Sequence, residues 1–155
     1  MGEVTVTKRF EIAYSHHLPG YRGKCARLHG HNAIIEVSVQ GSFLREVTRD
    51  ASSYYDPNGH YYPFIMDFSL LKDTVNNILK NYDHHDLNEV FEKESANNLG
   101  EASEMIMIPS CEVFASKLFD SIQSEICLRT QGRARLVKIK VTETSDSWVE
   151  VEEWS

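Results

Sequence analysis

Alternation between apolar and polar residues is the feature that most constrains what this chain can fold into. In residues 3–14, valine, phenylalanine and isoleucine occupy even-numbered positions, and threonine or charged residues fill most of the odd-numbered ones. Similar alternation returns at 33–40 and 134–144. Successive side chains of a strand point to opposite faces, so each stretch is predicted to be a half-buried strand in an antiparallel sheet. The predicted inward rows are Val4, Val6, Phe10 and Ile12; Ala33, Ile35, Val37 and Val39; and Val137, Ile139 and Val141.

Between these strands, apolar residues recur at the spacing of a helix. One helix is predicted to begin at Asp67 or Ser69, either of which could cap it, and to stop near Asn81. A second helix is predicted to open at Pro109. The apolar stripes are Leu71, Val75, Ile78, Leu79 and Tyr82 in the first helix, and Val113, Phe114, Leu118, Phe119, Ile122 and Ile126 in the second.

The predicted order is strand, strand, helix, helix, strand, strand, with a short last strand from Trp148 to Trp154. Because strands and helices are segregated, we expect an α+β fold: a four-stranded antiparallel sheet with two helices packed on one face. Residues 42–64 and 83–103 are predicted to be long connections. A length of 155 residues suits a single domain spanning 1–155.

The composition narrows the class of protein. A net charge of −7 argues against generic nucleic-acid binding. No apolar run approaches the length of a membrane span, and the first residues lack the apolar core of a signal peptide. Three scattered cysteines fit a reducing compartment. We therefore expect a cytoplasmic protein without nucleic-acid or membrane partners, and unpaired edge strands favour a homo-oligomer.

The stretch Cys25–Asn32 carries the strongest chemical signal. His29 and His31 are two residues apart, so in an extended backbone their imidazoles project to the same side and can hold one metal ion. A catalytic zinc site takes three protein ligands and leaves one position open. His16 or His17 can supply the third. The alternative is that these histidines are ordinary loop and strand residues.

Five further side chains are candidates for chemistry. Cys25 is either a small buried hydrophobe or a thiolate stabilised by nearby cations and a metal. Asp83 can orient His84 for acid–base work, although the same residues can be a solvated helix end. Glu143 has the inward parity of its strand, where a carboxylate needs a cationic or amide-like partner. Glu112 either lines a site or complements a helix dipole.

Taken in order, these residues resemble a known family, the 6-pyruvoyltetrahydropterin synthase superfamily, and within it the bacterial 6-carboxytetrahydropterin synthases of queuosine biosynthesis. The resemblance covers nearly the whole chain. It is carried by Ala13-Tyr14-Ser15-His16-His17-Leu18-Pro19, Lys24-Cys25-Ala26-Arg27-Leu28-His29-Gly30-His31-Asn32, Ile65-Met66-Asp67-Phe68, Tyr82-Asp83-His84-His85-Asp86-Leu87-Asn88, Pro109-Ser110-Cys111-Glu112-Val113 and Val141-Thr142-Glu143-Thr144. Tyr14 and Ser15 depart from it, because this family usually has two alanines there.

The resemblance assigns roles to the candidate residues. It implies that the zinc ligands are His16, His29 and His31. It further implies a catalytic thiol at Cys25 completed by Asp83 and His84, a pterin ring held by Glu143, and a pocket lined by Glu112. It also implies a tunnelling fold, in trimers that stack into hexamers with active sites at subunit interfaces.

We therefore expect a zinc-dependent carbon–carbon lyase. The expected reaction converts 7,8-dihydroneopterin triphosphate to 6-carboxy-5,6,7,8-tetrahydropterin, acetaldehyde and triphosphate. One alternative is a 6-pyruvoyltetrahydropterin synthase, which eliminates triphosphate from the same substrate. Others are a non-enzymatic, zinc-dependent pterin-binding assembly and a zinc hydrolase. Three imidazoles also suit iron or manganese.

Overall fold

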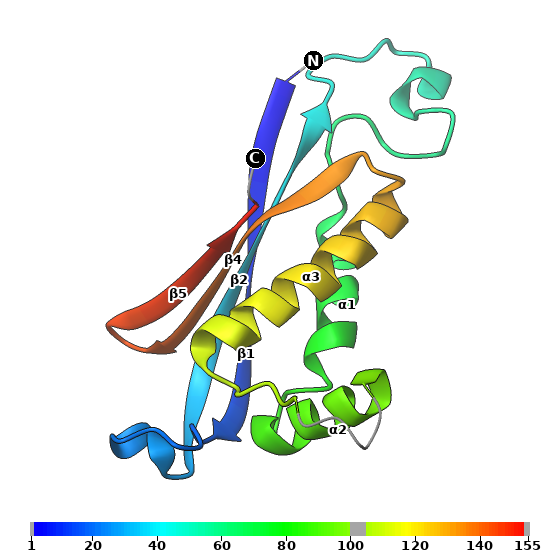
Figure 1. Cartoon of the computed structure of the whole chain (residues 1–155). Coiled ribbons are helices and arrows are strands. Elements are labelled where there is room, and N and C mark those ends of the chain that lie inside the picture. The colour runs from blue at the N-terminus through cyan, green and yellow to red at the C-terminus, as the bar shows by residue number, and fades with distance from the viewer. Residues whose placement is uncertain (1, 100–104, 154–155) are drawn as a thin grey trace.

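The computed structural model of the chain is a twisted sheet with three helices packed on one face (Figure 1). It describes residues 2–99 and 105–153. The strands follow each other across the sheet in the order β3-β1-β2-β4-β5. Their bounds are β1 Gly2–His16, β2 His29–Phe43, β3 His85–Asp86, β4 Ala134–Thr144 and β5 Ser147–Glu152. The helices are α1 Phe68–Leu79, α2 Leu87–Leu99 and α3 Cys111–Thr130.

The α+β class agrees with the prediction, but the sheet has five strands and is mixed. β3 pairs in parallel with the end of β1, placing Tyr14 opposite His85. The predicted all-antiparallel, four-stranded sheet is therefore wrong at this edge. Two residues are too few to show any periodicity, so the pattern of apolar residues gave no sign of β3.

The prediction of two helices is also wrong, because α2 occupies part of the connection expected at 83–103. Leu87 and Phe91, four residues apart, are its fully buried side chains. Two apolar anchors in an otherwise polar segment form too narrow a stripe to predict a helix from sequence. Residues 100–103 of that connection lie outside the described residues, as does Trp154 at the end of the predicted last strand.

The inward rows of β1 and β2 run from the core directly into a group of histidines. The antiparallel register places Phe10 opposite Ile35, Tyr14 opposite His31 and His16 opposite His29. Phe10 and Ile35 are buried, and His16 is only 3% exposed. The strands thus extend further than predicted. His16, expected in a loop, is the last residue of β1.

A register shift in β4 changes which residues face the core. Ser38 pairs with Lys138 but Val39 pairs with Leu136, which leaves Val137 as an extra residue. Leu136 and Ile139 are fully buried, whereas Val137 is half-buried and lines a hollow on the outer face. The prediction that Val137 belongs to the inward row is wrong because of this bulge.

The two predicted helices are present and capped as their sequences suggest. The Asp67 side chain accepts a hydrogen bond from the backbone N–H of Ser69 at 2.6 Å, so Asp67 is the N-cap of α1. The Ser110 hydroxyl accepts from the backbone N–H of Val113 and caps α3. The stripe of α3 is fully buried at Phe114, Leu118, Ile122 and Ile126. No described helix is long and apolar enough to cross a membrane.

Candidate active site

Three histidines converge where β1 and β2 end together. One ring nitrogen from each of His16, His29 and His31 lies within 4.8 Å of the others. The register explains this convergence, because His16 pairs directly with His29 and His31 lies opposite Tyr14, in the same inward row. His17 has the opposite parity, and its backbone N–H donates instead to the Asn88 side chain. Of the two histidines left open by the sequence, the structure brings His16 to the group.

Backbone carbonyls orient two of these imidazoles. His16 Nδ1 lies 2.7 Å from the carbonyl oxygen of Pro109, and His29 Nδ1 lies 2.7 Å from that of Arg27. A carbonyl only accepts, so each Nδ1 donates, and each Nε2 keeps its lone pair. This is the arrangement in which imidazole binds a metal through Nε2.

The separation of two of the donors is compatible with a four-coordinate metal. The Nε2 atoms of His16 and His31 are 3.2 Å apart. That separation matches the edge of a tetrahedron with metal–nitrogen bonds of roughly 2.0–2.1 Å, which is about 3.3 Å. Burial is the main cause that lowers the pKa of the His16 imidazole from 6.5; His29 and His31 also lower it, whereas the hydrogen bond to Pro109 and the charge of Glu143 act in the opposite direction. The neutral form needed for metal binding is therefore favoured.

The histidines line a cavity of about 440 Å³ that gathers most of the predicted site residues. Cys25, Glu112 and Glu143 line it together with the three histidines. Cys25 comes from a short 3-10 turn at Lys24–Ala26, Glu112 from the first turn of α3, and Glu143 from β4. Residues far apart in sequence thus meet around one space.

The carboxylate of Glu143 is close to one tyrosine and two of the three histidines. Its Oε1 accepts a hydrogen bond from the Tyr14 hydroxyl at 2.5 Å. His16 Nε2 lies 3.7 Å from Oε1, and His31 Nε2 lies 3.7 Å from Oε2. No lysine or arginine in the described part of the chain forms an ion pair with Glu143. The carboxylate can therefore accept hydrogen bonds from a ligand in the cavity.

Two thiols line the same cavity in different surroundings. Cys25 is exposed, whereas Cys111 is half-buried, with its Sγ 3.8 Å from the Val141 carbonyl oxygen. Burial raises the pKa of the Cys111 thiol to about 12, and the charges of Glu143 and Glu112 contribute to this increase. Cys111 is therefore held as a neutral thiol, whereas Cys25 is the exposed thiol of the cavity.

Asp83 and His84 do not line this cavity. Asp83 Oδ1 accepts from the backbone N–H of Ala13 and lies 2.9 Å from His84 Nδ1, so the two side chains do form a pair. The pair is at the sheet edge, and the His84 side chain is 80% exposed. His84 has a positive φ of 60° and lines a separate hollow, which Tyr14 and His31 also line.

Sequence reasoning assigned no role to Cys111 and Trp148, which line the cavity, or to Tyr14, which donates to the cavity residue Glu143. Tyr14 could have been found, because its even number continues the inward row of β1 toward His16. Trp148 is the second residue of β5, where it pairs with Thr142 of β4, and the centroid of its ring lies 4.5 Å from Lys140 Nζ. Its place in the cavity depends on the pairing of β5 with β4, which alternation does not reveal.

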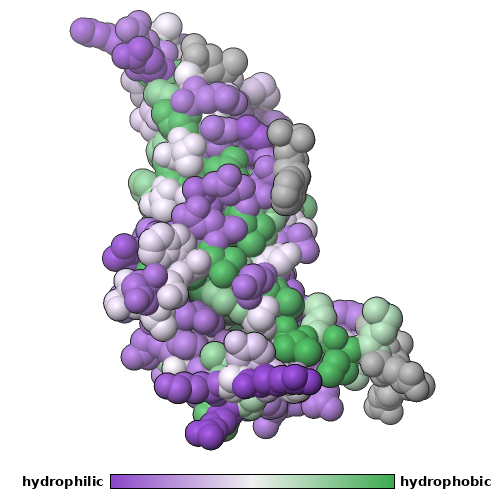
Figure 2. Space-filling view, turned by 60° about the vertical axis from the view of Figure 1, so that its left-hand side comes forward, coloured by the Kyte–Doolittle hydropathy of each residue, from purple (hydrophilic) through white to green (hydrophobic). Residues whose placement is uncertain are grey.

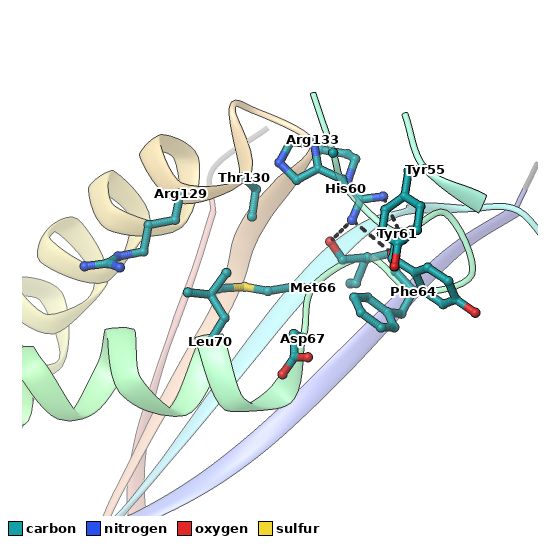
Figure 3. Close-up of a pocket in the computed structure, with 12 residues that line it drawn as sticks. Tyr55, His60, Tyr61, Phe64, Met66, Asp67, Leu70, Arg129, Thr130 and Arg133 are labelled. Carbon is teal, nitrogen blue, oxygen red and sulfur yellow. Dashed lines mark hydrogen bonds between the residues drawn. The ribbon is translucent and has the colours of Figure 1, made fainter. Parts of the chain in front are cut away.

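A second cavity lies at the opposite end of the sheet, beside the excursion formed by residues 42–64 (Figures 1 and 3). Figure 3 shows Tyr55, Tyr61 and Phe64 on one side of it and Met66 and Leu70 on the other. The predicted long connection is present and contains a 3-10 turn at Ala51–Tyr54. This cavity holds none of the three converging histidines, so the histidine cavity is the candidate active site.

Comparisons with known proteins agree on one family. The model of the 6-pyruvoyl tetrahydropterin synthase family matches residues 5–153. The putative 6-carboxy-5,6,7,8-tetrahydropterin synthase of Archaeoglobus fulgidus is 27% identical over 148 residues, which is 96% of this chain and 93% of the relative. The 6-carboxy-5,6,7,8-tetrahydropterin synthase of Synechocystis is 29% identical over 143 residues, covering 92% and 88%.

Solved structures show the same fold. The 6-pyruvoyl tetrahydropterin synthase of Caenorhabditis elegans aligns with a TM-score of 0.68 at 20% identity, covering 99% of this chain and 98% of that one. The corresponding protein of Plasmodium vivax aligns with a TM-score of 0.62 at 19% identity, covering 99% of both chains.

Proposed function

We propose the function of this chain from the premise that it belongs to the 6-pyruvoyl tetrahydropterin synthase family, as its motifs predicted. It is an enzyme, a lyase of the 6-carboxytetrahydropterin synthase type, in line with relatives of that name. Its substrate class is a pterin triphosphate. We take residues 1–155 as one domain and place the enzyme in the cytoplasm, which agrees with three free cysteines.

The proposed reaction converts 7,8-dihydroneopterin triphosphate to 6-carboxy-5,6,7,8-tetrahydropterin, acetaldehyde and triphosphate, a step of queuosine biosynthesis. One observation carries this proposal: the three imidazoles, the Cys25 thiol and the Glu143 carboxylate line a single cavity. A site for this chemistry needs a metal, a base and an acceptor for the ring, and the cavity provides side chains suited to all three.

Each residue of the cavity has a defined task in this proposal. His16, His29 and His31 would hold zinc, which supplies Lewis acidity toward the side-chain oxygens of the substrate. Glu143 accepts hydrogen bonds from the guanidine-like N–H edge of the pterin. Cys25, as the thiolate, removes a proton from a side-chain carbon. Glu112 lines the wall beside the ring.

We propose that Asp83 and His84 act in the site of another copy of the chain. His84 would exchange protons with the substrate oxygens while Asp83 holds its Nδ1, but within one chain the pair lies away from the cavity. An exposed apolar segment supports self-association: Met105 and Ile106 are 72% and 65% exposed. The face in Figure 2 has hydrophobic residues gathered beside the grey atoms at its lower right. A trimer or hexamer is the proposed assembly.

The test is to incubate the metal-analysed protein with 7,8-dihydroneopterin triphosphate and identify the products. We expect bound zinc, released acetaldehyde and the 6-carboxy product. Replacing Cys25 with alanine should lower turnover by about 10²–10⁴-fold, because it removes a positioned acid–base group. Cys127→Ala is the matched control. Cys127 is also an exposed cysteine but does not line the cavity, so turnover should not change.

Two results would contradict the proposal in different ways. A 6-pyruvoyl product without acetaldehyde would show the alternative synthase reaction on the same substrate. Absence of turnover in the zinc-loaded protein, together with pterin affinity unchanged by Cys25→Ala, would instead indicate a pterin-binding assembly.

A further inference from the structure

We propose that Tyr14 is a positioning residue, whose hydroxyl fixes the Glu143 carboxylate in the orientation that recognises the pterin ring. The inference rests on the proposed function, in which Glu143 accepts N–H bonds from a planar, guanidine-like edge. It adds to that function a residue that does not touch the substrate and acts through Glu143.

The hydroxyl and the carboxylate form a short, shielded contact. The Tyr14 hydroxyl donates to Glu143 Oε1 at 2.5 Å, and Tyr14 is only 4% exposed. Hydrogen bonds to an ionised acceptor are shorter and stronger than those between neutral groups. A carboxylate held through one oxygen loses most of its freedom to rotate about its terminal bond, so the direction of Oε2 is set as well.

The position of the hydroxyl is itself fixed by the packing of the tyrosine ring. The ring meets His16, His31 and Phe114 edge-on, with centroids 5.5, 5.9 and 5.2 Å away. Such edge-to-face contacts are favourable and directional. The packed ring of Tyr14 therefore holds its hydroxyl in place, and the hydroxyl in turn fixes the orientation of the Glu143 carboxylate at the cavity wall.

Among the described residues, Tyr14 makes the only hydrogen bond to this carboxylate. The His16 and His31 imidazoles are each 3.7 Å from one Glu143 oxygen, which is beyond hydrogen-bond distance. Both imidazoles belong to the proposed metal site, where they would serve as metal ligands. Tyr14 is thus the side chain that determines how Glu143 presents Oε2 to a ligand.

The experiment compares Tyr14→Phe with Tyr82→Phe. Tyr82 is a matched control: it is also 4% exposed, and its hydroxyl also donates to a glutamate, Glu94 Oε1 at 3.1 Å, but Glu94, unlike Glu143, does not line the histidine cavity. Phenylalanine keeps the ring packing in both. Binding of neopterin, an unreactive oxidised pterin, is measured by fluorescence with the zinc-loaded proteins, alongside zinc content and steady-state turnover.

We expect Tyr14→Phe to weaken neopterin binding by about tenfold, which corresponds to about 1.4 kcal/mol. KM should rise in parallel, with kcat changed less and zinc content unchanged. Tyr82→Phe should leave binding within twofold of wild type. In a Glu143→Ala background the effect of Tyr14→Phe should vanish, because the group that Tyr14 positions is absent.

Equal neopterin affinity in Tyr14→Phe and Tyr82→Phe would overturn the inference, as would a tenfold loss that persists in the Glu143→Ala background. If Tyr14→Phe does not fold, Tyr14→Met removes the hydroxyl while keeping apolar bulk, and the same criteria apply. Wild-type protein that neither binds neopterin nor turns over 7,8-dihydroneopterin triphosphate contradicts the proposed function itself. Wild-type activity with an unaffected Tyr14→Phe contradicts only the role of Tyr14.

Discussion

Two buried tyrosine–glutamate pairs lie on either side of one phenylalanine. Tyr14 donates to Glu143 in the histidine cavity, and Tyr82 donates to Glu94 of α2. Each tyrosine ring packs edge-on against Phe114, at 5.2 Å in both cases. The two pairs have the same chemistry and similar burial, so they differ mainly in what surrounds each carboxylate.

The second oxygen of each glutamate shows that difference. Glu94 Oε2 lies 2.7 Å from Lys117 Nζ, so the charge of Glu94 is neutralised within the fold. Among the residues that the structure describes, Glu143 Oε2 has only the His31 imidazole as an ion-pair neighbour, 3.7 Å away. The carboxylate of Glu94 is paired with a lysine and supports the fold, whereas the carboxylate of Glu143 faces a cavity. The comparison indicates that an unneutralised, well-oriented carboxylate marks a binding site.

Phe114→Ala should have the largest effect, because it removes the ring that both pairs share. Phe114 is fully buried, so the substitution should lower the free energy of unfolding by about 3–5 kcal/mol and should also weaken pterin binding. Urea unfolding and neopterin titration measure the two effects.

Phe91→Ala is the control for that substitution. Phe91 is also fully buried and contacts Tyr82 at 6.4 Å, but it has no ring contact with Tyr14 among the described residues. It should destabilise the protein similarly and leave pterin affinity unchanged. Equal loss of affinity in the two variants would mean that general loosening, not the Tyr14 pair, controls the site.

Glu143→Gln and Glu94→Gln separate the two pairs by function. The amide at position 143 loses one charged acceptor, so pterin binding should weaken by about 1.5–3 kcal/mol, or roughly 10- to 150-fold. Glu94→Gln should instead lower stability, because Lys117 loses its partner, and should leave binding intact. Calorimetric titration with neopterin and thermal unfolding distinguish these outcomes. Weaker neopterin binding by Glu94→Gln would contradict the distinction between the two pairs.

Alkaline pH should affect both pairs alike. Burial raises the pKa of the Tyr82 hydroxyl above its ordinary value of 10, as does the charge of Glu94, and Tyr14 shows the same direction with Glu143. A raised pKa means that the folded state keeps a proton that the unfolded state loses. Stability is therefore fully present below pH 10 and is lost as the pH rises above it.

For each such tyrosine this loss is at most about 1.4 kcal/mol per pH unit. Urea unfolding at pH 9, 10 and 11 should show a shallower decline in Tyr82→Phe and in Tyr14→Phe than in wild type. A decline unchanged in either variant would show that its tyrosine does not keep its proton in the folded state.

The parts of the fold that follow from local pattern could be predicted from sequence. Alternation located β1, β2 and β4, and helical spacing located α1 and α3. The inward parity of Glu143 followed in the same way, and the structure places this side chain in the cavity with the histidines.

The rest depends on long-range contacts that leave little mark on the sequence. β3 forms because two residues pair with the end of β1. α2 is anchored because the side chains of Leu87 and Phe91 are buried in the core. The sequence pattern shows Tyr14 only as a strand residue. The hydrogen bond from its hydroxyl to Glu143 could not be predicted, because Glu143 lies on a strand more than a hundred residues later.

Because of the bulge at Val137, one part of β4 tolerates a change of length and another part does not. Since Val137 is one residue more than the facing segment of β2 requires, its deletion would straighten the ladder and leave Ile139, Val141 and Glu143 facing inward. Loss of one residue between Ile139 and Glu143 would reverse the facing of everything beyond it and turn Glu143 away from the cavity. The loss of one residue can therefore be absorbed at the bulge, only a few residues from a segment whose length is fixed.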